Sequence, residues 1–242
     1  MMQKPRVSII TSIYKSENFM EHLLHDFSRQ TIFQDCEFLL INADSPENEE
    51  KYILPFQTVF PNNVIYKKLE QGLSVYETWN LAISMSSADL LTNWNTDDRR
   101  SFNSLELQVA ELESDPTLDV CYGPTLTTTV PNESVEHCTS GTGFACLEVT
   151  QELLLKNNSP HCLPMWRKDL HDRFGLFNTK YFSGADYEMW LRSLAGGAKF
   201  KRINRLIGSY YRNPVGISSN LATLEKAMAE VKEIQEIYAA RA

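Results

Sequence analysis

The chain has 242 residues, of which 43% are hydrophobic, and its formal net charge is -8 at pH 7. This length suits one large domain, and no low-complexity or Gly/Ser-rich linker divides it. Because the charge is negative and the basic residues are scattered, we expect no nucleic-acid partner.

The first half of the chain alternates strand and helix signals, which is typical of a parallel sheet with helices on its faces. Short apolar runs predict the strands, and apolar residues at helical spacing after a capping residue predict the helices. In chain order we expect a strand at residues 7–11, a helix capped by Ser16, a strand at 37–41, a helix opened by Ser45-Pro46-Glu47, a strand at 64–68, a helix at 75–86 with Ser74 and Glu77 as its capping box, and a strand at 89–94.

The second half is less regular. Helical spacing past Ser101 ends at Asp115-Pro116, and the pattern is weak from residue 123 to residue 164. We further expect a strand at residues 118–122, a short helix near 151–156, a helix from Met165 to Phe174, a helix opened by Gly184-Ala185-Asp186 and stopped by Gly196-Gly197, strands at 199–205 and 206–211, and a C-terminal helix from Leu221.

The five cysteines stand at irregular positions, which suits a reduced protein better than a disulfide framework. The pairs His137-Cys138 and His161-Cys162, with Cys146, lack the close spacing of zinc ligands, so we expect buried thiols and loop histidines. No secretory signal and no apolar run long enough to span a bilayer is found. We therefore expect a cytoplasmic location, including the inner face of the membrane as a peripheral site. His22 and His25 fall on the polar face of the first helix.

Two adjacent carboxylates, Asp97 and Asp98, follow the apolar strand that begins near Leu90. Carboxylates at the end of a buried strand are where an α/β protein holds a metal and a phosphorylated ligand. The alternative is a solvated loop, with Asp98 as the cap of the helix that starts near Ser101.

From about residue 6 to residue 216 the chain resembles a family 2 glycosyltransferase of the GT-A fold. The resemblance rests on residues 7–14 with Gln30-Thr31, on residues 37–45, 72–80 and 93–98, and on residues 165–192. It implies a Rossmann-like, mostly parallel mixed sheet flanked by helices. We expect a domain at 1–220, with a nucleotide-sugar half at 1–122 and an acceptor half at 123–220, and a C-terminal helix at 221–242.

The resemblance further implies an inverting enzyme that moves a single sugar from a nucleotide-diphosphate sugar, with a UDP-sugar expected, to a hydroxyl group. The acceptor would be a glycan, a lipid-linked molecule or a protein, in bacterial-type surface polysaccharide or glycoconjugate synthesis. Asp186 corresponds to the catalytic base, although Asp at a helix start is also a favoured cap. Asp97 and Asp98 would hold a divalent cation, Mn²⁺ or Mg²⁺. The expected donor-nucleotide residues are Ser12, Tyr14, Glu17, Asn42, Asp44, Asn80 and Asn95.

Asn42 and Asn95 stand where the family usually has acids, so each position loses a charge but keeps a carbonyl oxygen. This departure leaves open a nucleotide-sugar or glycan-binding domain without turnover. A nucleotidyltransferase is disfavoured because residues 12–16 contain no glycine, and a processive synthase because Gln-x-x-Arg-Trp is absent. Trp166 is a candidate for stacking on a sugar, and the C-terminal helix could pack on the domain or form a homodimer.

Overall fold

The computed structural model describes residues 4–138, 141–143, 146–217 and 219–240. Its strands are β1 (Val7–Ile13), β2 (Cys36–Asn42), β3 (Val64–Lys68), β4 (Leu90–Asn93), β5 (Arg99–Arg100), β6 (Val120–Tyr122), β7 (Thr125–Thr128), β8 (Thr142–Gly143), β9 (Met165–Arg167), β10 (Phe200–Arg202) and β11 (Gly208–Tyr211). Its helices are α1 (Glu17–Ser28), α2 (Glu50–Val59), α3 (Val75–Met85), α4 (Ser104–Ser114), α5 (Gln151–Leu154), α6 (Leu170–Phe174), α7 (Ala185–Ala195) and α8 (Leu221–Ala239), with 3₁₀ turns η1 (Phe33–Asp35) and η2 (Val135–His137).

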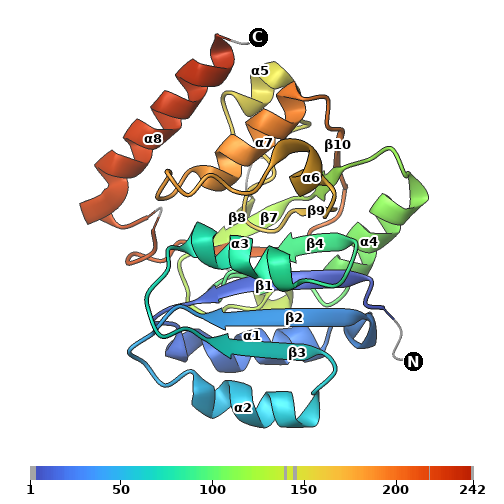
Figure 1. The fold of residues 1–242 in the computed structure, drawn as a ribbon, viewed down its shortest axis with the longest axis vertical. Helices are drawn as coiled ribbons and strands as arrows, with labels where there is room; N and C mark the ends of the chain where they lie inside the picture. The colour runs from blue at the N-terminus through green and yellow to red at the C-terminus, as the bar shows by residue number, and fades with distance from the viewer. Residues whose placement is uncertain (1–3, 139–140, 144–145, 218, 241–242) are drawn as a thin grey trace.

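A mixed seven-stranded sheet forms the centre of the molecule, with the order β10-β6-β9-β4-β1-β2-β3 (Figure 1). Within the described chain, β9 runs antiparallel to both of its neighbours and the other pairings in this sheet are parallel. A four-stranded sheet has the order β5-β11-β7-β8. The expectation of a mostly parallel α/β sheet flanked by helices is confirmed.

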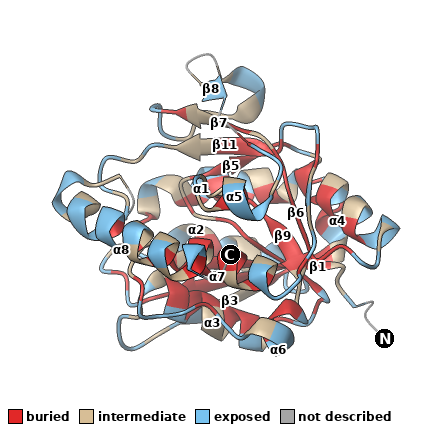
Figure 2. Ribbon diagram, turned by 90° about the horizontal axis from the view of Figure 1, so that it is seen from above, coloured by how far each residue is buried: buried red, intermediate tan, exposed pale blue. Residues whose placement is uncertain are grey.

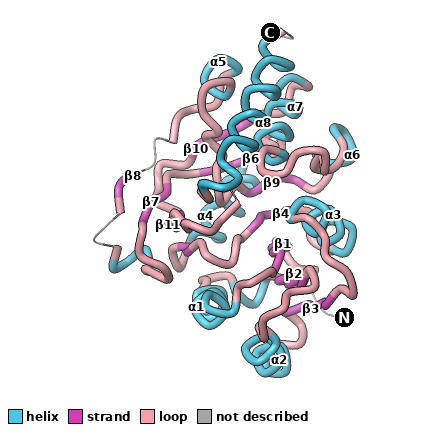
Figure 3. The backbone as a smooth tube through the Cα atoms, turned by 90° about the vertical axis from the view of Figure 1, so that its left-hand side faces the viewer, coloured by secondary structure: helices cyan, strands magenta, loops and turns pink. Residues whose placement is uncertain are grey.

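The alternation of side chains along β1 divides the core into two layers. Ile9 and Ile13 pack with the apolar sides of α1, α2 and α4, whereas Ile10 packs with α3 and α7. Figure 3 shows α1 and α2 on one side of the first strands and α3 on the other. The inner strands of this sheet are therefore buried on both faces, as the red strands of Figure 2 show, whereas the edge strands β3 and β10 are partly exposed.

The strand at residues 64–68 and the start of the helix at residue 75 are confirmed. The Ser74 side chain accepts a hydrogen bond from the Glu77 backbone, and the Glu77 carboxylate accepts one from the Ser74 N–H at 2.8 Å. This reciprocal pair satisfies two of the donors that a helix start leaves without intrahelical partners.

Four expectations about the type or the bounds of elements are wrong. Met165–Arg167 is strand β9, held between β4 and β6, and only Leu170–Phe174 is helical. The helix expected at Ser45 begins at Glu50 instead, because the Ser45 hydroxyl donates to the Glu49 carboxylate at 2.7 Å within a loop. The last two strands are shorter than expected and belong to different sheets.

The carboxyl ends of the parallel strands meet at one edge of the main sheet. Ile13 lies opposite Asn42, and Ile10 lies opposite Asn93, so β1, β2 and β4 end close together. In Figure 1 the arrowheads of β1, β2 and β3 point to the left, toward this edge. In open α/β sheets this is the edge where ligands bind.

Strand β11 brings the late chain to the acidic loop. Gly208 and Ser209 pair antiparallel with Arg100 and Arg99. A Cβ on Gly208 would lie 2.3 Å from the Arg99 carbonyl oxygen and 2.3 Å from Leu163, so only glycine permits this approach. The residues after β11 are thereby placed beside Asp97 and Asp98.

The C-terminal helix α8 packs on α7 of the same chain through Ala227, Glu230, Ile234 and Tyr238, which are buried. Pairing of two copies through α8 stays a prediction. No helix in the described residues has the length and apolarity to span a bilayer.

Candidate functional site

A cleft of ≈ 1320 Å³ opens at the carboxyl edge of the main sheet. Its walls come from the end of β1, the loop after β4, the starts of α3 and α7, the segment after β11, and α8. Five of the predicted site residues line it: Ser12, Tyr14, Asn95, Asp97 and Asp186. The acidic loop and the predicted base, widely separated in sequence, thus face one cavity.

The loops that follow β1 and β2 are tied to each other beside this cleft. The Lys15 N–H donates to the Ser45 hydroxyl at 2.9 Å, and the Ser16 N–H donates to the Glu49 carboxylate at 2.9 Å. Lys15 takes a positive φ of 51°, which turns the chain sharply after Tyr14. Ser16 occupies the N-cap position of α1, but its side chain makes no capping bond, so that part of the cap prediction is wrong.

Two of the residues predicted to contact the donor nucleotide, Glu17 and Asn42, bond within these two loops and do not line the cleft. The Glu17 carboxylate pairs with Lys51 and accepts the N–H of Asn48 at 2.9 Å. Asn42 is fully buried, and its Oδ1 accepts the N–H of Ser45 at 2.8 Å. In this conformation both side chains shape the loop, and their contact with a nucleotide stays a prediction.

Asp44 and Asn80 also lie outside the cleft lining. Asp44 is exposed and has a positive φ of 60°, which suits a turn. The Asn80 side chain makes two hydrogen bonds to the Phe177 backbone: it donates to the carbonyl oxygen at 2.9 Å and accepts from the N–H at 3.0 Å. Asn80 thereby fixes the position of α3 against the chain segment that precedes α7.

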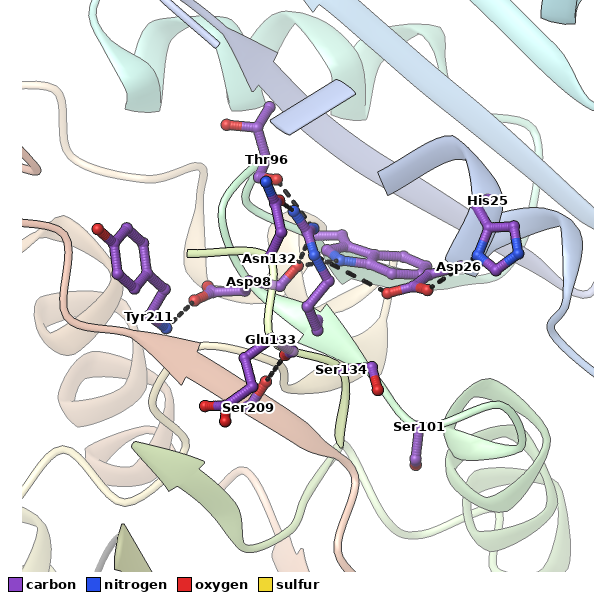
Figure 4. Close-up of polar contacts among 12 residues, drawn as sticks. His25, Asp26, Thr96, Asp98, Ser101, Asn132, Glu133, Ser134, Ser209 and Tyr211 are labelled. Atoms are coloured by element: carbon purple, nitrogen blue, oxygen red, sulfur yellow. Dashed lines mark hydrogen bonds and ion pairs between the residues drawn. The ribbon is translucent and has the colours of Figure 1, made fainter. Parts of the chain in front are cut away.

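The two carboxylates of the acidic loop differ in exposure. Asp97 is half-buried and lines the cleft, and its Oδ2 accepts from the Asn213 side chain at 2.9 Å. Asp98 is fully buried. One of its oxygens accepts the Tyr211 N–H at 3.2 Å (Figure 4), and the other accepts from the Asn95 side chain at 3.0 Å. The alternative of a solvated loop is therefore wrong for Asp98.

Burial raises the pKa of both carboxyl groups, and the charge of Asp97 raises the pKa of Asp98 further. Two neighbouring carboxylates withdrawn from water form an environment that favours a positive ligand. They fit one hard divalent cation, which characteristically uses one or two protein carboxylates together with substrate phosphates. No group of three or more His, Cys, Asp or Glu side chains among the described residues forms an all-protein metal cage.

Arg99 holds the acidic loop from behind. Its side chain is 2% exposed and donates to the carbonyl oxygens of Thr96 at 3.1 Å and Asp98 at 2.7 Å. It also donates to the Asn132 side chain, and its Nε lies 4.0 Å from Asp26 of α1 (Figure 4). Because a buried guanidinium keeps its charge, this contact fixes the backbone on both sides of Asp97.

The predicted base Asp186 lies in the first turn of α7 and is half-buried at the cleft. Its Oδ1 accepts from the Tyr76 hydroxyl at 2.9 Å and its Oδ2 from the Asn158 side chain at 3.0 Å. The N-cap position is Gly184, and no side-chain capping bond is made there. The alternative role of Asp186 as a helix cap is therefore wrong.

The phenolic hydroxyl of Tyr76 stays protonated at neutral pH. Burial, and secondly the Asp186 charge, raise the pKa of Tyr76 well above its usual value, so the hydroxyl is a donor at neutral pH. Sequence reasoning missed Tyr76, Asn158 and Asn213, because each contacts its carboxylate across a large distance in sequence. No local signal marked them.

Replacing Tyr76 by phenylalanine keeps the ring against Trp79 and removes the hydrogen bond to Asp186. A hydrogen bond to a charged group contributes about 1.5–3 kcal/mol, so we expect kcat to fall about tenfold or more for an Asp186-dependent reaction. The matched control is Tyr122→Phe, which removes a hydroxyl bonded to the Leu147 carbonyl. Equal kcat in Tyr76→Phe and wild type would contradict this role.

The remaining sequence expectations concern aromatic residues and histidines. Trp166 is fully buried, packs on Trp190 and donates to His171 at 2.9 Å, so its expected role in sugar stacking is wrong. His22 and His25 are exposed, as expected. The four cysteines Cys36, Cys121, Cys146 and Cys162 are buried free thiols, and Cys138 is a half-buried one.

Comparison with known proteins gives a family and a fold. Residues 8–174 match the family described as Glycosyl transferase family 2. A segment of 66 residues is 32% identical to the minor teichoic acid biosynthesis protein GgaB of Bacillus subtilis strain 168. This matched segment makes up 27% of this chain and 7% of GgaB.

Solved structures with the same fold include a TarS protein and a mannosyltransferase. TarS of S. aureus in complex with UDP-GlcNAc has a TM-score of 0.76 and 15% identity, over 96% of this chain and 66% of that chain. The mannosyltransferase PcManGT from Pyrobaculum calidifontis in complex with GDP-Man and Mn²⁺ has a TM-score of 0.72 and 13% identity, over 99% of this chain and 65% of that chain. The chain thus spans less than two thirds of these relatives.

Proposed function

Because the chain belongs to glycosyl transferase family 2, we propose that it is an inverting glycosyltransferase that moves a single sugar from a nucleotide-diphosphate sugar to a hydroxyl acceptor. The observation that carries this proposal is the shared cleft, in which Asp97 and Asp186 line one cavity at the carboxyl edge of the sheet. Transfer needs neutralisation of the leaving diphosphate and a base for the attacking hydroxyl; Asp97 would serve the first through a bound cation, and Asp186 would be the base.

On the donor side, we propose that Ser12, Tyr14 and Asn95 contact the nucleotide, with Asn42 and Asp44 in the adjoining loop. Tyr14 exposes 52% of its surface at the cleft, so its ring is available for stacking. A UDP-sugar is the proposed donor, which is supported by the UDP-GlcNAc bound to TarS. The GDP-Man bound to PcManGT makes a guanosine donor the competing choice.

We propose that Asp97 holds a divalent cation, Mn²⁺ or Mg²⁺, with Asp98 as the second carboxylate of the site. When bound, such a cation supplies a Lewis acid that offsets the charge of the departing diphosphate. Asn213, Tyr211 and Asn95 then keep the two carboxylates oriented through the hydrogen bonds described above. The Mn²⁺ in the PcManGT complex supports this assignment.

On the acceptor side, the Asp186 carboxylate takes the proton of the attacking hydroxyl. A bond forms between the acceptor oxygen and the anomeric carbon, the bond from that carbon to the diphosphate oxygen breaks, and the diphosphate leaves with the electron pair. Attack on the face opposite the diphosphate inverts the anomeric centre. Tyr76 and Asn158 orient the carboxylate by donating to its two oxygens.

For the acceptor we propose a glycan, lipid-linked or protein hydroxyl in surface polysaccharide or glycoconjugate synthesis. The match to GgaB, a minor teichoic acid biosynthesis protein, supports this class. The competing proposal is a nucleotide-sugar or glycan-binding domain without turnover, which is favoured by the uncharged Asn42 and Asn95.

The proposal is tested by incubating the protein with Mn²⁺, UDP-GlcNAc, UDP-glucose, UDP-galactose or GDP-mannose, and teichoic acid or synthetic glycoside acceptors. We expect release of nucleoside diphosphate and a product heavier by one sugar, with inverted anomeric configuration by NMR. Thermal stabilisation by a donor without any product would support the binding domain instead. No stabilisation and no product with any donor would overturn both proposals.

A further inference from the structure

The loop that leads into α7 has no capping side chain of its own. Gly184 is the N-cap residue, and the structure records no side-chain capping bond from it. The amides of a helix start and its preceding loop need acceptors, and an unpaired buried amide is costly. The acceptor for this loop comes from another element, α8.

Glu230 of α8 supplies that acceptor. One of its carboxylate oxygens accepts the Phe182 N–H at 2.7 Å, and the other accepts the N–H groups of Ser183 at 2.8 Å and Gly184 at 3.3 Å. Glu230 is only 8% exposed. A buried carboxylate is stable when its oxygens are satisfied, and negative charge at a helix N-terminus is favourable.

The backbone is shaped for this contact. A Cβ added to Gly184 would lie 2.9 Å from Cδ1 of Ile234 and 3.8 Å from Cβ of Glu230. Glycine therefore allows α8 to approach the start of α7 closely. A second bond, from the Tyr238 hydroxyl to the Glu188 carboxylate at 2.6 Å, ties the two helices one turn further along α7.

The same loop contacts Tyr76, which in turn contacts the proposed base. The Tyr76 hydroxyl lies 2.7 Å from the Ser183 carbonyl oxygen and 2.9 Å from Oδ1 of Asp186. Glu230 accepts the N–H of Ser183, and the single hydroxyl hydrogen of Tyr76 is shared between the Ser183 carbonyl oxygen and Oδ1 of Asp186. A displaced loop would thus move Tyr76 and the first turn of α7 together.

We infer that Glu230 is a positioning residue for sugar transfer: it holds residues 182–184 so that Tyr76 and Asp186 keep their orientation toward the acceptor. The inference rests on the proposed function. It makes α8 part of the site, which agrees with the lining of the cleft by Ala227 and Val231 of this helix.

The test compares Glu230→Gln with Glu233→Gln. Glutamine places an NH₂ group where the amides need an acceptor, whereas Glu233 lies one turn away on the same helix and pairs with Lys180 at the surface. At a temperature where all variants are folded, we expect kcat of Glu230→Gln to fall about 10- to 100-fold, because displacement of a reacting group by about 1 Å has effects of this size. We expect the donor KM to stay unchanged and Glu233→Gln to match the wild type.

Two further measurements separate this role from general stabilisation. Hydrogen exchange at the amides of residues 182–184 should accelerate in Glu230→Gln and not in Glu233→Gln. Glu230→Asp keeps the charge with a shorter reach, so it should restore part of kcat, and it serves as the test variant if Glu230→Gln fails to fold.

The inference is overturned if folded Glu230→Gln transfers sugar at the wild-type rate, or if kcat and donor KM change in parallel. If the wild type transfers no sugar, the proposed function fails, and the inference about transfer fails with it. Accelerated exchange at residues 182–184 with normal kcat would show that Glu230 holds the loop without positioning the base.

Discussion

Replacing Asp186 by asparagine is expected to lower kcat for sugar transfer by about 10²- to 10⁴-fold, the range that a positioned general base contributes. The asparagine carbonyl can still accept the hydrogen bond from Tyr76. Oδ1 of Asn158 is a buried acceptor for which the described structure records no partner, so a rotated Asn158 amide can receive the new NH₂ group. The fold and the donor site should therefore persist while the base is lost.

The measurement is kcat under saturating donor, together with the thermal shift that the nucleoside diphosphate produces. Asp169→Asn is the matched control, because Asp169 is exposed and makes no capping bond at α6. Near wild-type transfer by Asp186→Asn would refute the assignment of the base. An equal loss of nucleotide binding would instead place Asp186 on the donor side.

Replacing Asp97 by asparagine is expected to abolish the stabilisation that Mn²⁺ and the nucleoside diphosphate produce together. Asp97 is the carboxylate of the pair that lines the cleft, so its charge should dominate cation binding. A ligand present at 100 times its dissociation constant stabilises by about 2.7 kcal/mol, so the loss is measurable by thermal unfolding. Transfer should fall by at least about 10²-fold, and excess chelator should have the same effect on the wild type.

The companion variant Asp98→Asn tests how the buried charge of Asp98 affects folding stability when no cation is bound. Burial raises the pKa of Asp98, so the folded state holds this proton more tightly than the unfolded state does. Without a cation, stability should therefore fall as the pH rises from about 4 through the raised pKa of the folded state. At pH 7 we expect cation-free Asp98→Asn to melt higher than the wild type, by about 2–4 °C per kcal/mol regained.

Near pH 4 the difference between Asp98→Asn and the wild type should shrink, because both side chains are then largely neutral in the folded state. Full transfer by Asp97→Asn, or undiminished transfer by the wild type in chelator, would refute the metal site. A melting temperature of Asp98→Asn that tracks the wild type at every pH would show that the buried charge is compensated inside the protein.

The elements that were predicted well carry their information locally. The strand at residues 64–68 begins with the β-branched pair Val64-Ile65, and the start of α3 follows from a capping box whose two members lie three residues apart. The helix predicted from Met165 is wrong at residues 165–167, because three residues hold no periodicity and the pairing of β9 with β4 and β6 is set by distant residues. The segment Ser45-Pro46-Glu47 is typical of a helix start, but the Ser45 hydroxyl donates to the Glu49 carboxylate and α2 begins only at Glu50.

For the site, the sequence by itself indicated the carboxylates proposed to hold the cation and the carboxylate proposed as the base. An apolar strand that runs into Asp97 and Asp98 fixes these acids at the carboxyl edge of a parallel sheet, and the family resemblance marks Asp186. Tertiary structure decided which of the paired acids lines the cleft and which is buried. It also supplied Tyr76 and Glu230, whose hydrogen bonds join residues far apart in the chain. Periodicity and capping act over a few residues and can be recognised in sequence, whereas the orientation of a carboxylate depends on packing between elements that only the folded chain brings together.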